Sequence, residues 1–178
     1  IRVCDTSLGI DHVYNYGTFD FGTPNLYLKF ALGNLDYMLS VQNYKDFILS
    51  YQYEGRWVVE QKLNLTSDER NKLFNLLIEN CKKENRYYKY DFFRDNCATR
   101  ARDIIKNTYR NLIDLTFREI IYPYTNERLM WWQFGVDALL GMRCDRPVST
   151  ADCMFIPFYL QNHLDTTNLC LSSTLILD

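Results

Sequence analysis

The amino-acid sequence predicts an α+β domain in which helices pack against a small antiparallel sheet. Segments with the residue pattern of strands occupy the first half of the chain, and segments with the pattern of helices dominate the second half. No repeat, low-complexity stretch or linker separates the two halves. We therefore expect a single domain over residues 1–178, with a helical C-terminal part.

Four strands are expected in the first half of the chain. The opening residues, IRV, have the pattern of a strand already under way, so we expect the chain to be a fragment that lacks its first strand or part of it. The other three strands are expected at HVYNYG (12–17, ended by Gly17), LDYMLSV (35–41) and RWVVEQKLNL (56–65).

The clearest helix is predicted at residues 65–84, where Thr66 and Glu69 have the spacing of a capping box. An extended aromatic segment, NRYYKYDFF, follows this helix, and another helix begins after Asn96. The remaining helices are expected at LYLKFAL (26–32, closed by Gly33), NYKDFILSYQY (43–53), the segment after the capping-box pair Thr116 and Glu119, NERLMWWQFGVDALLG (126–141) and TADCMFIPFYLQNHL (150–164, broken or kinked near Pro157).

Composition excludes several kinds of partner. The net charge is −2 with acidic and basic residues interspersed, which offers no electrostatic surface for nucleic acid. The most apolar stretch contains Gln133 and Asp137 and is too short for a transmembrane segment. The six cysteines form no C-x-x-C pair and the chain has two histidines, so we expect no metal site and no cofactor.

The best candidate for chemistry is Cys97, in the stretch RDNCATRARDII. Asn96 is a favourable N-cap, which places Cys97 at the first position of a helix. The free N–H groups and the macrodipole at that position are expected to lower the thiol pKa. The alternative is an ordinary buried thiol, since free cysteine is among the most buried residue types. The cysteine spacing predicts that Cys97 is not in a disulfide.

Neither histidine of the chain is a convincing base for this cysteine. His12 lies three residues before Asn15 in the predicted strand, so alternation should turn its side chain away from the cleft that Asn15 faces. His163 comes late in a predicted helix, where a solvated or C-terminal capping role is expected.

Several motifs together resemble one known family. They are VYNYGTFDF, YEGRWVVEQKLNLT, TFREII, FGVDALLG, MFIPFYL and, most specifically, ENRYYKYDFFRDNCATRARDII. These resemble the Lnb N-terminal periplasmic domain family of bacterial envelope proteins over essentially the whole chain. That family in turn resembles the circularly permuted papain-like hydrolases of the NlpC and lecithin:retinol acyltransferase type, so the resemblance implies a permuted papain-like fold.

Carried over residue by residue, the resemblance implies that Cys97 is the nucleophile and that Asn15 orients the catalytic histidine. The alternative for Asn15 is a turn-adjacent side chain bonded to the backbone. The family's histidine lies in a GHT-type motif immediately ahead of the segment that matches IRV, so here it would precede Ile1. The 178-residue form is therefore expected to be inactive.

Three residues of the same motif are further candidates. Asp95, Asn96 and Arg100 are expected to contribute to binding, with helix capping and structural ion pairing as the alternative.

Two functions follow from these expectations. The first is a cysteine hydrolase or acyl transferase acting on an amide or ester, with a peptidoglycan peptide, a lipid or a protein amide as the substrate class. The second is a non-catalytic envelope module that uses the same scaffold for binding or assembly. The expected location in both cases is the bacterial periplasm or cell envelope.

Overall fold

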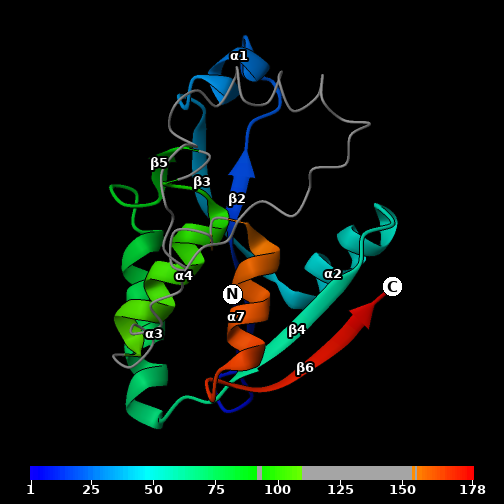
Figure 1. Ribbon diagram of the computed structural model, residues 1–178, viewed down its shortest axis with the longest axis vertical. Coiled ribbons are helices and arrows are strands. Elements are labelled where there is room, and N and C mark those ends of the chain that lie inside the picture. Colours follow the sequence, from blue (N-terminus) through cyan, green and yellow to red (C-terminus); the bar gives the residue numbers. More distant parts are fainter. Residues whose placement is uncertain (92–93, 110–153, 155) are drawn as a thin grey trace, which may run out of the picture.

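The computed structural model describes residues 1–91, 94–109, 154 and 156–178. Two antiparallel sheets form its framework (Figure 1). The larger sheet has the strand order β1-β2-β3-β5, and the smaller one pairs β4 with β6. The strands are β1 Arg2–Asp5, β2 Ile10–Phe19, β3 Asp36–Asn43, β4 Val58–Leu63, β5 Tyr87–Lys89 and β6 Cys170–Leu177.

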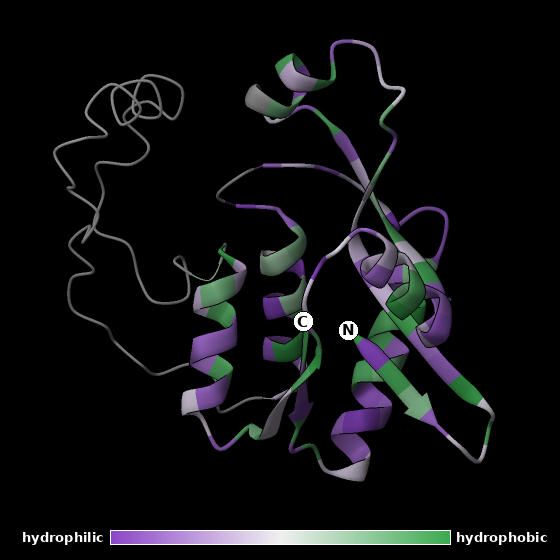
Figure 2. Cartoon of the chain, turned by 90° about the vertical axis from the view of Figure 1, so that its right-hand side faces the viewer, coloured by the Kyte–Doolittle hydropathy of each residue, from purple (hydrophilic) through white to green (hydrophobic). Residues whose placement is uncertain are grey.

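Helices cover this framework, which confirms the predicted α+β class. Helix α4 packs on β2 and lies between α3 and α7, while α2 packs against β2 and β3 (Figure 1). Hydrophobic and hydrophilic positions alternate along the helices, as expected where one face of each helix is buried (Figure 2). The helices are α1 Leu26–Ala31, α2 Tyr44–Tyr53, α3 Ser67–Cys81, α4 Cys97–Thr108 and α7 Pro157–Thr166.

Local sequence motifs correctly predicted where α3 begins and where α1 ends. At the start of α3 the Thr66 hydroxyl accepts a hydrogen bond from the Glu69 amide, and the Glu69 carboxylate accepts one from the Thr66 amide. At the end of α1 the Gly33 and Asn34 amides donate back to the Phe30 and Lys29 carbonyls. Gly33 has φ +65°, the left-handed conformation that this helix ending requires.

Other expectations were wrong in detail. Gly17 does not end its strand, because a bulge between Asn15 and Thr18 carries β2 on to Phe19. Pro157 is the first residue of α7, where its missing N–H group costs no hydrogen bond, and most of the predicted helical residues before it lie outside the described residues. Strand β6 was not predicted. The expected helices after Thr116 and at 126–141, and the first residues of the one at 150–164, lie outside the described residues.

The main hydrophobic core lies between the larger sheet and the helices α3, α4 and α7. Leu77 and Leu169 are almost completely buried within it, although they lie far apart in the sequence. The other buried members are Tyr14, Tyr16, Leu39, Leu73, Ala98, Ile104, Ile105, Met154, Leu160 and Leu164.

A second, aromatic cluster lies in the larger sheet beside α1. It is built from the buried side chains of Leu35, Tyr37, Tyr88 and Tyr90. The Tyr90 ring stacks on Phe30 of α1 at a centroid distance of 4.9 Å. The cluster therefore connects β3 and the segment around β5 with the α1 end of the molecule (Figure 1).

Candidate active site around Cys97

Helix α4 begins at Cys97, as predicted, and Asn96 fixes that start. The Asn96 backbone is extended, and its side-chain oxygen accepts hydrogen bonds from the amides of Ala98 and Thr99, both at 2.9 Å. In return the Asn96 amide donates to the Thr99 hydroxyl at 2.8 Å. Two of the amides that a helix start leaves without partners are thus satisfied by one side chain. The cysteine is held rigidly at the first helical position.

The chain enters this helix through a tight turn. The amide of Asp91 donates to the Asp95 carbonyl at 2.9 Å, and the amide of Asp95 donates to the Asp91 carbonyl at 3.1 Å. The Arg94 amide also donates to the Asp91 carboxylate at 3.0 Å. These bonds fix the direction in which the chain approaches Cys97.

Arg100 links the turn to the aromatic cluster. Its guanidinium donates two hydrogen bonds to the Asp95 carboxylate, with the second at 2.6 Å, and lies 4.4 Å over the Tyr88 ring. The carboxylate raises the pKa of Arg100. Asp95, Asn96 and Arg100 thus make the capping and pairing contacts that were the structural alternative, and a role for them in binding stays a prediction.

The thiol of Cys97 is free and exposed, as expected. Its pKa is not lowered, which corrects the expectation from the helix start. Desolvation by the protein on its inner side raises the pKa of Cys97, and this outweighs the backbone amides of Ala98 and Cys97, which act in the opposite direction. At neutral pH the side chain is therefore a thiol until a cationic partner stabilises the thiolate.

Gly17 brings Cys97 and Asn15 together. A Cβ atom at Gly17 would lie 3.7 Å from the Cys97 Cβ and 3.3 Å from the Asn15 side-chain oxygen. That oxygen accepts a hydrogen bond from the Gly17 amide at 2.8 Å, which is the backbone bond considered as the alternative for Asn15. The three residues nevertheless share one point in space, and the bulge of β2 delivers Asn15 to the start of α4. A role for Asn15 in orienting a histidine stays a prediction.

Neither histidine of the chain contacts this point. His12 pairs with Val3 and Asn43, three residues before Asn15, so strand alternation turns it to the other face. In the described part of the chain no imidazole or carboxylate contacts the Cys97 sulfur, and desolvation and backbone amides account for its pKa.

His163 differs from its prediction. It is neither solvated nor a capping group, because its side chain lies in the core-facing side of α7 with 8% of its surface exposed. Its Nε2 atom has no hydrogen-bond partner among the residues that the structure describes. Burial lowers the pKa of His163.

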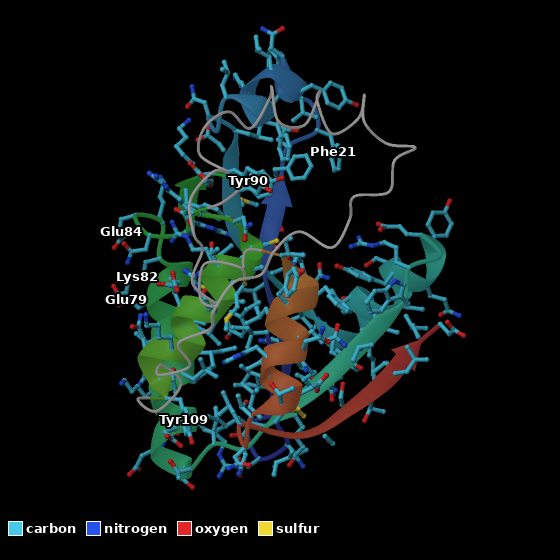
Figure 3. All side chains as sticks on the ribbon, viewed as in Figure 1. Phe21, Glu79, Lys82, Glu84, Tyr90 and Tyr109 are labelled. Carbon is cyan, nitrogen blue, oxygen red and sulfur yellow. The ribbon has the colours of Figure 1, made fainter. Side chains whose placement is uncertain are left out.

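Sequence reasoning missed the tyrosines that adjoin the site. Tyr37 on β3 lies opposite Tyr88 on β5, and Tyr90 stacks on Tyr37 at 4.5 Å. The pKa of all three is raised, first by burial and also by the negative charge of Cys97. Figure 3 labels Tyr90 and Phe21, which both lie at the end of the molecule that carries α1. The available signal was the spacing in YYKY, which puts Tyr88 and Tyr90 on one face of an extended segment.

The described residues also bear on metal sites and membrane spans. No group of three histidine, cysteine or acidic side chains there is arranged to hold a metal ion. No helix in this part of the chain has both the length and the apolar character needed to cross a bilayer.

Comparison with known protein families gives a match over most of the chain. The model of a family described as the Lnb N-terminal periplasmic domain matches residues 1–130, which include Asn15, Gly17 and the whole of α4. The search of curated proteins and the search of solved structures each found no match.

Proposed function

Because the chain belongs to the Lnb N-terminal periplasmic domain family, and so has a role in the bacterial envelope, we propose that it is a papain-like cysteine hydrolase or acyl transferase. The bond attacked is an amide or ester in the periplasm. The single observation that carries the proposal is the free, exposed Cys97 at the capped start of α4, brought beside Asn15 over Gly17.

The reaction needs two steps at Cys97. The sulfur attacks the carbonyl carbon, a C–S bond forms, and the C–N or C–O bond of the substrate breaks as a base returns the thiol proton to the leaving group. Water, or the amine or hydroxyl of an acceptor, then attacks the thioester and restores the thiol. Water makes the protein a hydrolase and an acceptor molecule makes it an acyl transferase.

The start of α4 can help to stabilise the oxyanion. Asn96 accepts from the amides of Ala98 and Thr99, and the amide of Cys97 faces its own thiol. This amide is available to a carbonyl oxygen at the attacked carbon. The positive end of the macrodipole of α4 favours the same negative charge.

The base in this proposal is a histidine that precedes Ile1. The geometry of the first strand supports that position. The Ile1 amino group donates to the Tyr14 carbonyl at 2.9 Å, and the Tyr14 amide donates to the Ile1 carbonyl at 2.8 Å, so the β1–β2 pairing runs through Ile1. Continued in the same register, a residue before Ile1 would lie opposite Asn15. A histidine there would meet both Asn15 and Cys97, and its cation would offset the desolvation of the thiolate.

Exposed apolar side chains favour a lipid among the three substrate classes. Phe21, Tyr27, Leu28 and Leu32 have between 59% and 86% of their surface exposed, around the short helix α1. The stack of Phe30 on Tyr90 joins this apolar rim to the tyrosines beside Cys97. If the rim holds an acyl chain, a long-chain p-nitrophenyl ester should acylate Cys97 faster than p-nitrophenyl acetate does. Equal rates would favour a peptide substrate.

Alkylation of Cys97 by iodoacetamide tests the proposal. We would compare the 178-residue chain with a longer form that carries the upstream histidine, each with a Cys97→Ala control for the other cysteines. Because burial raises the thiol pKa, labelling of the 178-residue chain should rise only at a pH above that of an ordinary cysteine. In the longer form, labelling should already be fast near neutral pH, and replacement of the histidine by alanine should remove this gain.

The same experiment separates the two functions. If both forms react no faster than a model thiol at every pH, Cys97 is structural and the non-catalytic module is the correct reading. Asn15→Ala is the matched variant for the orienting role. It should shift the pH profile of the longer form and leave that of the 178-residue chain unchanged.

A further inference from the structure

The three tyrosines beside Cys97 form one packed unit. Tyr37 and Tyr88 are paired across β3 and β5 with ring centroids 5.9 Å apart, and Tyr90 stacks on Tyr37. Each has less than a tenth of its surface exposed. The rings are therefore fixed, and so are the directions in which their hydroxyl groups project.

Their hydroxyl groups have different partners. The Tyr88 hydroxyl donates to the Tyr16 carbonyl at 2.6 Å. Among the described residues, neither the Tyr37 nor the Tyr90 hydroxyl has a hydrogen-bond partner. In the same set the fully buried polar atoms that lack a partner are Arg86 Nε and His163 Nε2. The Tyr37 and Tyr90 hydroxyls are not among these atoms, and each has a proton to donate.

The unit is connected to Gly17 and to the first turns of α4 through Tyr88. Tyr88 is held between the Tyr16 carbonyl, next to Gly17, and the guanidinium of Arg100 on the first turns of α4. Gly17 is also the residue against which the Cys97 Cβ lies. Burial raises the pKa of Tyr37 and of Tyr90, and the charge of Cys97 adds to this in both cases. Tyr37 packs directly on Tyr88 with ring centroids 5.9 Å apart, whereas Tyr90 packs on Tyr37, so Tyr37 carries the unpartnered hydroxyl on the ring next to Tyr88.

We propose that the Tyr37 hydroxyl is a catalytic donor that binds the substrate carbonyl oxygen as Cys97 attacks, and that Tyr90 positions the Tyr37 ring by stacking on it. This inference rests on the proposed function. It gives the oxyanion a side-chain hydrogen-bond donor in addition to the amide of Cys97. Burial keeps both phenols protonated at neutral pH, which a hydrogen-bond donor requires.

Two reagents for the same sulfur test the donor. p-Nitrophenyl acetate acylates Cys97 through a tetrahedral oxyanion and releases p-nitrophenolate, whereas iodoacetamide alkylates it by displacement of iodide without an oxyanion at the attacked carbon. The ratio of the two rates at one pH cancels the fraction of thiolate. Both rates would be measured on the 178-residue chain by mass spectrometry of the peptide that contains Cys97.

The Tyr37→Phe variant should lower the ratio of acylation to alkylation by about 10²-fold, the loss typical of one oxyanion donor, with alkylation unchanged. Tyr90→Phe keeps the stacked ring and should leave the ratio within about twofold of the wild type. Tyr88→Phe is the matched control, because the Tyr88 hydroxyl donates its hydrogen bond to the Tyr16 carbonyl. It should lower the melting temperature without a selective loss of acylation.

The outcomes separate this inference from the proposed function. An unchanged ratio in a folded Tyr37→Phe variant, or an equal fall in both rates, would overturn the role of Tyr37. If wild-type Cys97 shows no higher ratio of acylation to alkylation than a model thiol, the proposed function fails and this inference fails with it.

Discussion

At the scale of single residues, the start of α4 depends on one side chain. Asn96 is 5% exposed. Its side-chain oxygen accepts hydrogen bonds from two backbone amides, and its own backbone amide donates to the Thr99 hydroxyl. The position of Cys97 relative to Gly17 follows from this cap, because the cysteine is the next residue in the chain. The site is thus built on a rigid helix end and not on a loop.

Asn96→Ala should lower the free energy of unfolding by about 1–2 kcal/mol, since two buried amides lose their acceptor. Urea unfolding followed by circular dichroism measures this loss. Asn96→Asp keeps an acceptor at the same place and should cost clearly less. Equal effects of the two substitutions would show that the cap is not what holds the helix start.

At the scale of elements, helix α7 places the imidazole of His163 in a buried position. His163 lies on the same side of the helix as Leu160 and Leu164, and its pKa is lowered by burial. In the unfolded chain the same histidine titrates near its ordinary pKa of about 6.5. Between the two pKa values the unfolded chain binds the proton and the folded chain does not, so the free energy of unfolding falls as the pH falls through this window.

The stability that neutral His163 contributes is expected to be fully present above pH ~6.5 and to be lost as the pH falls below that value. The Ile1 amino group, whose pKa burial lowers from 8.0 to about 6, adds a slope of the same sign at higher pH. Urea unfolding at several pH values measures the slope. His163→Leu removes the titrating group and should flatten the curve in this range. If the slope persists in that variant, another group is responsible for the acid sensitivity.

At the scale of the whole molecule, segments from both ends of the chain complete one core. Leu160, Leu164 and Leu169 are buried with residues of α3 and α4, and β6 pairs with β4. The Gln61 side chain donates to the Gln161 carbonyl and to Asp165, which ties β4 to α7. Helix α7, Leu169 and strand β6 all lie beyond residue 130, where the family match ends.

A chain that ends at residue 130 should therefore fail to form a cooperatively folded domain, because its apolar core and β4 lose their cover. The measurement is thermal unfolding together with binding of a dye for exposed apolar surface. Leu164→Ala in the 178-residue chain is the control. It should cost about 2–5 kcal/mol and keep a single cooperative transition. A folded 1–130 form would show that α7 and β6 are dispensable additions.

The sequence did not predict the arrangement of charged groups between the two sheets. Arg2 on β1 donates to Asp11 on β2 and to Glu60 on β4, at distances of 2.7 Å and 2.6 Å, and lies 3.5 Å over the Tyr44 ring. This one side chain joins the larger sheet to the smaller one and to α2. No local pattern predicts such a contact, because Glu60 lies 58 residues from Arg2 in the sequence.

Local signals predicted much of the fold and part of the site. The capping box at Thr66 and the cap at Asn96 each involve neighbouring residues, so the sequence predicted where α3 and α4 begin. Strand β6 escaped prediction, because its residues follow no regular alternation of buried and exposed positions and only pairing with β4 makes it a strand.

By itself the sequence determined the α+β class, the helix start at Cys97 and the family resemblance, since each depends on residues that are neighbours or lie in one motif. Only the tertiary structure decided which groups meet at the cysteine. The bulge of β2 brings Asn15 and Gly17 to it, and the pairing of β3 with β5 brings the tyrosines. Tertiary structure also decided the thiol pKa. The amides at the helix start lower the pKa of Cys97. Burial by other segments destabilises the thiolate by more than these amides stabilise it, so the pKa is raised.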